Sequence, residues 1–281
     1  MRLGWLMLAG LLITGGRWSA AQTGAVGGRE AVGFDRNDYP GDATMAAMHK
    51  QFAFTGYWLT NPPGEKANSW LGKREILLRQ GWGFLVLANG KLEVEILKAQ
   101  KAGTAPGDLG KKDAADAIAA ASRERFPART ILFLDQEEGG RLTDPQAGYL
   151  LAWTEAVARS GFRAGVYASG QKTQDDPGVW IDTVEDIRER VKIGGLHEVA
   201  IFDAQDQCPP APGCTLQPKP LSAAGEPEVV AWQYAQSPRR ASITKSCAKT
   251  YAADGMCYAA GFPKVFLDMD AARSSDPSNG R

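Results

Sequence analysis

Histidine is scarce in this chain: His49 and His197 are the two among 281 residues. A Ser-His-Asp triad needs a histidine within hydrogen-bond reach of its nucleophile, and neither Ser160 nor Ser169 has a His-Asp pair close to it in the sequence. The four cysteines form no CxxC pair and lie far from both histidines in the sequence, so the spacing of a zinc site is missing. The chain therefore favours neither a serine hydrolase nor a zinc protein.

The chain also lacks an excess of charge of either sign, because Lys plus Arg and Asp plus Glu number 32 each. Without a basic field, we expect no nucleic-acid partner and no attraction to an anionic membrane surface. The first expected strand is not followed by G-x-G-x-x-G, and an acidic D-x-E pair is by itself no metal signature. We therefore expect no cofactor and no resident metal.

No apolar run is long enough to span a bilayer comfortably. The run Leu3–Ile13 follows a charged start at Arg2 and precedes Ser19-Ala20-Ala21, which is typical of a secretory signal peptide over residues 1–21. An uncleaved anchor is the alternative. We expect a secreted, extracellular or periplasmic protein without stable membrane insertion after cleavage.

Export suits disulfide formation. The spacing of the cysteines favours two short loops closed by Cys208–Cys214 and Cys247–Cys257. Four cysteines allow three connectivities, so the pairing stays open.

Residues 31–272 are long enough for one large domain, between a Gly-rich flexible segment at 22–30 and a polar, disordered tail at 273–281. Helices are expected at 43–51, 70–80, 111–126, 144–160 (with Asp144 as N-cap) and 182–191, a long polar loop at 89–109, and no helix in the proline-rich stretch 207–227. Nearly all-apolar strands are expected at 31–35, 54–59, 82–88, 131–134, 163–169, 199–203, 229–234 and 265–270. This alternation predicts a parallel sheet. Eight strands favour an α/β fold of the (β/α)8 TIM-barrel type, irregular in its later segments, over an open doubly wound sheet.

The fourth expected strand ends in an acidic motif, Asp135-Gln136-Glu137. Side chains alternate along a strand, so Asp135 and Glu137 point to one side about 7 Å apart along the chain. Like charges with partial burial raise at least one pKa, and such a pair suits general acid/base chemistry on a sugar or acyl bond. The alternatives are solvated loop acids or a cap for the next helix.

Other strands also end on acids, and the carboxyl ends of barrel strands share one rim that carries the active site. These rim acids are Asp35, Asp135, Glu137, Asp203, Asp268 and Asp270. Trp58, Tyr167, Trp232, Gln233 and Tyr234 join them, although Gln233 faces the other way from Trp232 and Tyr234. Aromatic faces stack on sugars while acids and amides bind hydroxyls, so the pattern predicts a carbohydrate cleft. Each acid alone could instead cap a helix, and each aromatic could be core.

Five motifs in order strengthen this prediction: Gly33-Phe34-Asp35, Leu134-Asp135-Gln136-Glu137, Ala164-Gly165-Val166-Tyr167-Ala168-Ser169, Val230-Ala231-Trp232-Gln233-Tyr234 and Phe266-Leu267-Asp268-Met269-Asp270. Together they resemble the DUF1906 family, the glycoside hydrolase-like domain related to the family 25 lysozymes. The resemblance covers about residues 31–272 and implies an irregular barrel, secretion and a cleft for a glycan such as peptidoglycan.

By analogy with those lysozymes, Glu137 matches the proton donor, and Asp135 matches the acid that stabilises the charged intermediate or orients the N-acetyl group. Asp35 and Asp268 match the acids of the first and last strands. Trp58, Tyr167, Asp203, Gln233 and Asp270 are the candidate substrate-binding residues. Residues 36–40 depart from the lysozyme pattern. At this place, after the acid of the first strand, the lysozymes carry a Ser-rich, Gln-containing segment.

These features predict a secreted glycoside hydrolase that cleaves an N-acetylated cell-wall glycan, as a peptidoglycan muramidase does. Because of the departure after Asp35, a non-catalytic glycan-binding module with the same barrel is the alternative. A metal-dependent hydrolase of another ester is a third hypothesis, which rests on the acid cluster alone.

Overall fold

The computed structural model describes residues 30–204, 220–237 and 257–281. The expected signal peptide, residues 22–29 of the expected flexible segment, and Cys208, Cys214 and Cys247 lie outside these residues. Cys257 is fully buried, and the disulfide pairing stays a prediction.

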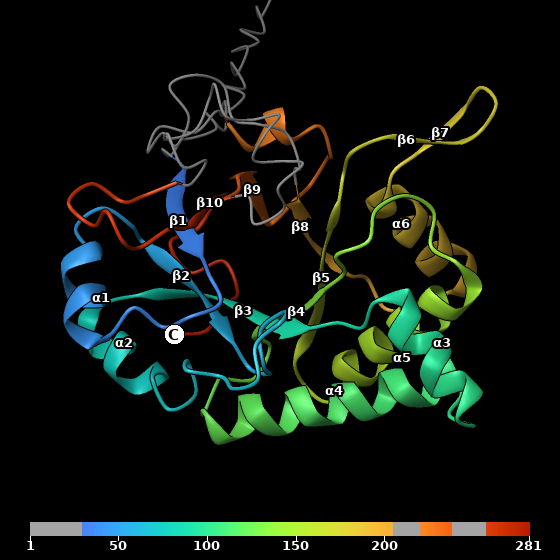
Figure 1. The fold of residues 1–281 in the computed structure, drawn as a ribbon, viewed down its shortest axis with the longest axis horizontal. Helices are drawn as coiled ribbons and strands as arrows, with labels where there is room; N and C mark the ends of the chain where they lie inside the picture. Colours follow the sequence, from blue (N-terminus) through green and yellow to red (C-terminus); the bar gives the residue numbers. More distant parts are fainter. Residues whose placement is uncertain (1–29, 205–219, 238–256) are drawn as a thin grey trace, which may run out of the picture.

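Eight strands close a barrel in the order β1-β10-β9-β8-β5-β4-β3-β2 (Figure 1). The barrel strands are β1 (Ala31–Asp35), β2 (Phe54–Trp58), β3 (Gly83–Asn89), β4 (Ile131–Asp135), β5 (Arg163–Ser169), β8 (Ala200–Ala204), β9 (Ala231–Ala235) and β10 (Asp268–Ala272). The helices are α1 (Asp42–Met48), α2 (Arg74–Gln80), α3 (Glu93–Lys101), α4 (Pro106–Arg123), α5 (Asp144–Ala158), α6 (Thr183–Gly194) and a 3-10 turn η1 (Leu221–Ala224). The predicted α/β barrel is confirmed.

Aromatic rings fill the lower interior of the barrel, and glycines make room for them. A Cβ on Gly33 of β1 would lie 2.3 Å from the Phe54 ring, and a Cβ on Gly165 of β5 would lie 2.4 Å from the Phe133 ring. Because side chains alternate along each strand, the residues two positions later on these strands point to the same interior, above the rings. These rings thus form an apolar floor beneath the carboxyl ends of the strands.

The last strand runs opposite to the prediction. β10 pairs antiparallel with both β1 and β9, with Asp268 opposite Asp35 and Asp270 opposite Gly33. The strand therefore starts at the rim on Asp268 rather than ending there. Antiparallel direction brings Asp268 to the expected rim, but it places Asp270 one inward-facing position deeper.

The segment 89–109, predicted as a polar loop, instead contains α3 and the start of α4. Ile96 is the one residue of α3 that is buried, so the apolar stripe is too sparse to show helical periodicity. The N-cap of α5 lies one residue earlier than predicted. It is Thr143, whose hydroxyl accepts the Gln146 N–H while the Gln146 side chain accepts the Thr143 N–H.

The C-terminal residues, predicted as a disordered tail, pack across the opposite end of the barrel from the acidic rim. The backbone of Ser278 pairs with Ile131 and Phe84 at the starts of β4 and β3, and its hydroxyl accepts the Val86 N–H at 2.8 Å. Ser278 is fully buried. Polar composition suggested disorder, but these side chains bind backbone groups at the strand starts.

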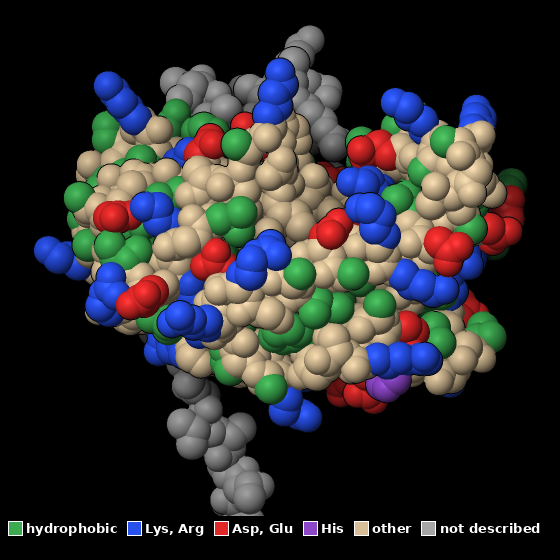
Figure 2. Space-filling model, turned by 90° about the horizontal axis from the view of Figure 1, so that it is seen from below, with side chains coloured by type: hydrophobic (Ala, Val, Ile, Leu, Met, Phe, Trp, Pro, Cys, Tyr) green, Lys and Arg blue, Asp and Glu red, His purple; other side chains and the backbone are tan. Residues whose placement is uncertain are grey.

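A hairpin of β6 (Thr173–Asp176) and β7 (Val179–Ile181) extends away from the barrel after β5 (Figure 1). On the face seen in Figure 2, basic and acidic side chains are interspersed without a large patch of either sign. No helix in the described part of the chain is long and apolar enough to cross a membrane.

Candidate functional site: a carboxylate cleft at the barrel rim

A cleft of about 500 Å³ opens at the carboxyl ends of the parallel strands. It collects seven of the nine residues predicted to be catalytic or substrate-binding: Asp35, Trp58, Asp135, Glu137, Tyr167, Gln233 and Asp268. They come from six barrel strands and the segment that follows β4, as alternation along each strand requires. The structure therefore brings together side chains that are up to 233 positions apart in the sequence.

Asp35 is held by a chain of hydrogen bonds across the cleft. The Gln233 side chain donates to Asp35 Oδ2 at 2.8 Å, and the Tyr167 hydroxyl donates to Gln233 Oε1 at 2.8 Å. Gln236 in turn donates to the Tyr167 oxygen at 3.0 Å. Asp35 is 6% exposed and lines the cleft, so this network fixes its carboxyl group at the cleft wall.

The backbone after Asp35 is anchored by two indoles. Trp58 Nε1 donates to the Arg36 carbonyl at 3.1 Å, and Trp70 Nε1 donates to the Asn37 carbonyl at 2.8 Å. This segment, which departs from the lysozyme pattern, thus holds Trp58 and the cleft residue Asn37 at the rim.

Asp135 and Glu137 share the cleft but differ in exposure. Asp135 is 5% exposed, whereas Glu137 is an exposed residue of the cleft wall. Burial raises the pKa of Asp135 well above its usual range, and the charges of Glu137 and Asp35 raise it further. Asp135 is therefore a group that tends to stay protonated beside an accessible carboxyl.

The third acid of this segment has a structural part. Glu138 Oε2 accepts hydrogen bonds from the Glu93 N–H and the Gln146 side chain, both at 2.7 Å. It thereby ties the start of α3 and the first turn of α5 to the segment that carries Glu137.

Asp268 is oriented by the backbone of the neighbouring segment. Its Oδ1 accepts the Ser237 N–H at 2.5 Å, and the Ser237 hydroxyl donates to the Leu267 carbonyl at 2.7 Å.

Burial and the surrounding acids raise the pKa of Tyr167 well above its usual range, so its hydroxyl remains a donor.

Two predicted substrate-binding residues do not line the cleft. Phe202 and Ala204 of β8 line it, so Asp203 between them faces the other side of the sheet. There Asp203 Oδ1 accepts the Gly170 N–H at 2.9 Å. Asp270 is fully buried below Asp35. Trp232 and Tyr234 also lie outside the cleft and pack on each other at 5.8 Å between ring centroids.

Several cleft residues were missed by the sequence analysis because all of them except Asn89, which ends β3, lie in the loops and the helix that follow strands. These polar residues are Asn37, Asn89, Lys91, Glu95, Gln236 and Ser237. Only the strand-end position of Asn89 carried a signal that could have identified it. The rest depend on how each loop folds back over the rim, which strand periodicity does not report.

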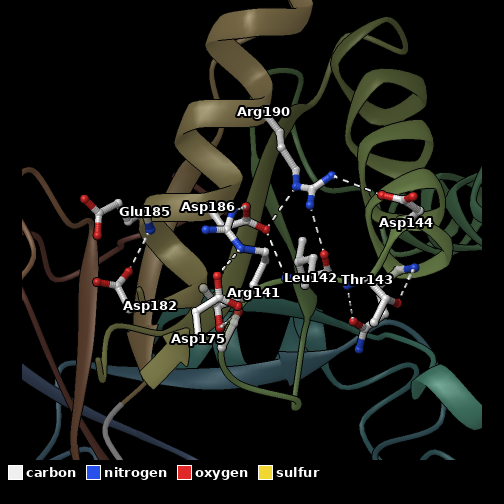
Figure 3. Close-up of polar contacts among 12 residues, drawn as sticks. Arg141, Leu142, Thr143, Asp144, Asp175, Asp182, Glu185, Asp186 and Arg190 are labelled. Carbon is white, nitrogen blue, oxygen red and sulfur yellow. Dashed lines mark hydrogen bonds and ion pairs between the residues drawn. The ribbon is translucent and has the colours of Figure 1, made fainter. Parts of the chain in front are cut away.

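A buried aspartate clamps the segment that follows the acidic motif (Figure 3). Asp186 on α6 accepts the Leu142 N–H at 3.0 Å and bonds with Arg141 at 3.3 Å and Arg190 at 3.0 Å. Arg190 also donates to the Leu142 carbonyl at 2.9 Å. This Asp186 clamp joins α6 to the segment five residues after Glu137.

Comparison with family models finds the Rv2525c-like, glycoside hydrolase-like domain over residues 50–206, more than half of the chain. The chain belongs to this family. No curated protein matches it. The matched residues include β2 to β8 and the acidic motif, which agrees with the resemblance inferred from the sequence.

Two of the similar solved structures share the fold of this Rv2525c-like chain at low identity. An uncharacterized B. stearothermophilus protein is 18% identical with a TM-score of 0.54, covering 86% of this chain and 95% of that one. The autolysin LytC of Streptococcus pneumoniae, solved with a synthetic peptidoglycan ligand, is 12% identical with a TM-score of 0.50, covering 86% of this chain and 46% of that one. The Tat-secreted protein Rv2525c of Mycobacterium tuberculosis is 14% identical with a TM-score of 0.48, covering 90% and 98%.

Proposed function

We propose that this protein is a glycoside hydrolase that cleaves an N-acetylated cell-wall glycan of the peptidoglycan type. The observation that carries this proposal is the position of Glu137, an exposed carboxyl that lines the cleft two residues after the buried Asp135 and near the buried Asp35. Membership of a glycoside hydrolase-like family and the shared fold with a peptidoglycan-bound autolysin support it.

In this proposal Glu137 donates a proton to the leaving glycosidic oxygen, because it follows the end of β4 at the rim and is exposed to a sugar chain bound in the cleft. Asp135, two residues away and inclined to stay protonated, hydrogen-bonds the acetamido group. Asp35 and Asp268 each accept a hydrogen bond, from Gln233 of β9 and from the Ser237 N–H after it, and they stabilise the positive charge that develops on the sugar ring. Trp58 offers a ring at the cleft wall.

The experiment is a digest of purified peptidoglycan by the wild type and by Glu137→Gln, with released reducing ends counted and product masses measured. The substitution keeps the shape and removes the acid, so we expect a loss of about 10²-fold to 10⁴-fold. Glu75→Gln is the matched control, because Glu75 is an exposed carboxylate that pairs with Arg79 on α2.

Equal product release by the wild type and Glu137→Gln would contradict the proposal. Wild type that binds peptidoglycan or chitin oligomers without releasing products would instead support the second candidate, a glycan-binding module. The stretch of residues 36–40, which departs from the lysozyme pattern, motivates that candidate.

Export through an N-terminal signal peptide is part of the proposal and rests on the pattern of residues 1–21. N-terminal sequencing of the exported protein tests it, and we expect the mature chain to start at Gln22. A mature chain that starts at Met1 would contradict cleavage.

A further inference from the structure

Asp270 is a fully buried carboxyl that the proposed chemistry leaves without a part. It lies on β10 opposite Gly33, one inward-facing position below Asp268 and Asp35. The Phe54 ring packs on Gly33 at this level. The side chain therefore sits between the aromatic floor of the barrel and the acids of the cleft.

The surroundings of Asp270 disfavour its charged form. Neither of its oxygens accepts a hydrogen bond from an N–H or O–H donor in the described part of the chain. The charged groups that act on it are the carboxylates of Asp35 and Asp268. On β9, the charge of Asp270 contributes to raising the pKa of the Tyr234 phenol. Among the described residues, no Lys or Arg forms an ion pair with it. A buried carboxylate without a donor or a cation is strongly disfavoured.

Asp270 lies on the strand paired with β1, one inward-facing position from the level of Asp35, and the two side chains interact as hydrogen-bond partners. Two ionised carboxylates are both acceptors and repel each other, so this contact is a hydrogen bond only if one of them carries a proton. Gln233, which lies opposite Asp270 in the β9–β10 pairing, already donates to Asp35 Oδ2 at 2.8 Å. Asp35 is therefore already an acceptor, and Asp270 is the residue of the pair that carries the proton.

We propose that Asp270 holds a proton and donates it in a hydrogen bond to Asp35, acting as a positioning residue beneath the cleft. Burial and the negative charge of Asp35 and Asp268 raise the pKa of Asp270 well above its usual range, in agreement with this arrangement. The functional consequence rests on the proposed hydrolase activity. Asp35 is then held between two donors, Gln233 and Asp270, and keeps its negative charge for the reaction.

The proposed hydrogen bond between Asp270 and Asp35 exists only below the pH at which Asp270 loses its proton. When Asp270 loses its proton at high pH, its carboxylate repels Asp35 and the donor beneath Asp35 is lost. We therefore expect the alkaline limb of the activity profile to depend on Asp270, although Asp270 itself never touches substrate.

The test compares Asp270→Asn with Asp270→Leu by infrared spectroscopy and activity. For the activity measurements, each substitution is made alone in the wild-type protein. For the infrared spectra, each is combined with Asp135→Asn, because Asp135 would contribute a second signal from a protonated carboxyl group. At pH 7 the background protein should show the C=O stretch of a protonated carboxyl, and Asp270→Asn should remove it. The Asn amide can still donate to Asp35, so activity should persist and lose its alkaline limb, whereas Asp270→Leu should lose about 10-fold to 100-fold.

A background protein without the protonated signal, or a signal that persists in Asp270→Asn, would overturn the proposal. If Asp270→Asn does not fold, titration of the signal in the background protein decides alone: loss of the signal near pH 4 would overturn it. The spectra do not depend on turnover. A protein that shows the expected signal but cleaves no glycan would therefore refute the hydrolase activity and leave the proton-sharing pair in place.

Discussion

The carboxyl groups of Asp135 and Glu137 lie two residues apart and differ in their access to water. Asp135 ends β4 inside the barrel wall, and Glu137 lies beyond the strand, where the chain leaves the barrel. One motif thus supplies a buried acid and an accessible acid on the same side. Environments that give two neighbouring carboxyl groups different pKa values are typical of glycosidase sites.

Replacing Asp135 by Asn should stabilise the fold, increasingly so as pH rises. The folded state raises the pKa of Asp135 above its ordinary value of 3.8, so the folded protein binds more protons than the unfolded chain above about pH 4. Stability linked to this group is therefore present at low pH and is lost as pH rises toward the raised pKa. An Asn side chain does not titrate, so the variant avoids this loss of stability while keeping the shape of the Asp135 side chain.

The measurement is the midpoint of thermal unfolding at pH 4 and pH 7. We expect Asp135→Asn and wild type to unfold at similar temperatures at pH 4, and the variant to unfold at a higher temperature at pH 7. A variant less stable than wild type at pH 7 would contradict the burial of an uncompensated acid at this position.

The sequence could place Asp35, Asp135 and Glu137 at the cleft because a period of two and a shared rim determine their position. Asp268 reaches the same rim because β10 runs antiparallel. The same reasoning failed for Asp203 and Asp270. Ending a strand on an acid does not tell which face the acid occupies, since a shift of one residue moves it across the sheet. The direction of β10 was not visible either, because its short apolar run reads the same both ways.

At the scale of elements, α6 controls the segment after the acidic motif through the Asp186 clamp (Figure 3). Asp186 is 2% exposed at its side chain, and Arg141 and Arg190 are 41% and 26% exposed. Solvent screens the ion pairs between Asp186 and the two arginines. Most of the stability lost on removing Asp186 therefore comes from the hydrogen bond of the Leu142 N–H and from the fixed position of this segment.

Asp186→Ala should lower the free energy of unfolding by about 2–3 kcal/mol, because it leaves the buried Leu142 N–H without its acceptor and removes charge-assisted bonds. Activity should fall as well, since the segment carrying Glu137 loses its tie to α6. Asp175→Ala is the control, because Asp175 pairs with the exposed side of Arg141 at 2.7 Å. Chemical denaturation checks both variants, and equal effects of the two would contradict a clamp centred on Asp186.

Long, apolar elements such as β3, β4 and α5 were predicted within a few residues, because burial dictates their composition. The hairpin β6–β7 and helix α3 were missed. Each buries few side chains, and every residue of β6 is exposed. Elements held by neighbouring structure rather than by their own apolar face leave little trace in a sequence.

At the scale of the whole molecule, the C-terminal residues close the end of the barrel opposite the cleft. Asp276 Oδ1 accepts the Phe84 N–H at 2.9 Å, and Arg74 donates to the Gly280 carbonyl at 2.6 Å. A Cβ on Gly83 would lie 1.8 Å from the Ser275 carbonyl oxygen. These residues pack directly on the first residues of β3.

Removing residues 275–281 should therefore destabilise the whole barrel by about 3–5 kcal/mol, as several buried backbone groups lose their partners. Glycan binding at low temperature should be retained, because the cleft lies at the other end. Unfolding curves and binding at 10 °C check this. A truncated protein as stable as the full chain would mean that the C-terminal residues do not close the barrel.

The most direct measurement of the central claim is a crystal structure of Glu137→Gln with a bound peptidoglycan oligosaccharide. We predict that the sugar chain crosses the cleft with a glycosidic oxygen about 3 Å from the amide at position 137 and an acetamido group beside Asp135. A sugar chain bound elsewhere on the surface, or an empty cleft at saturating oligosaccharide, would contradict the account.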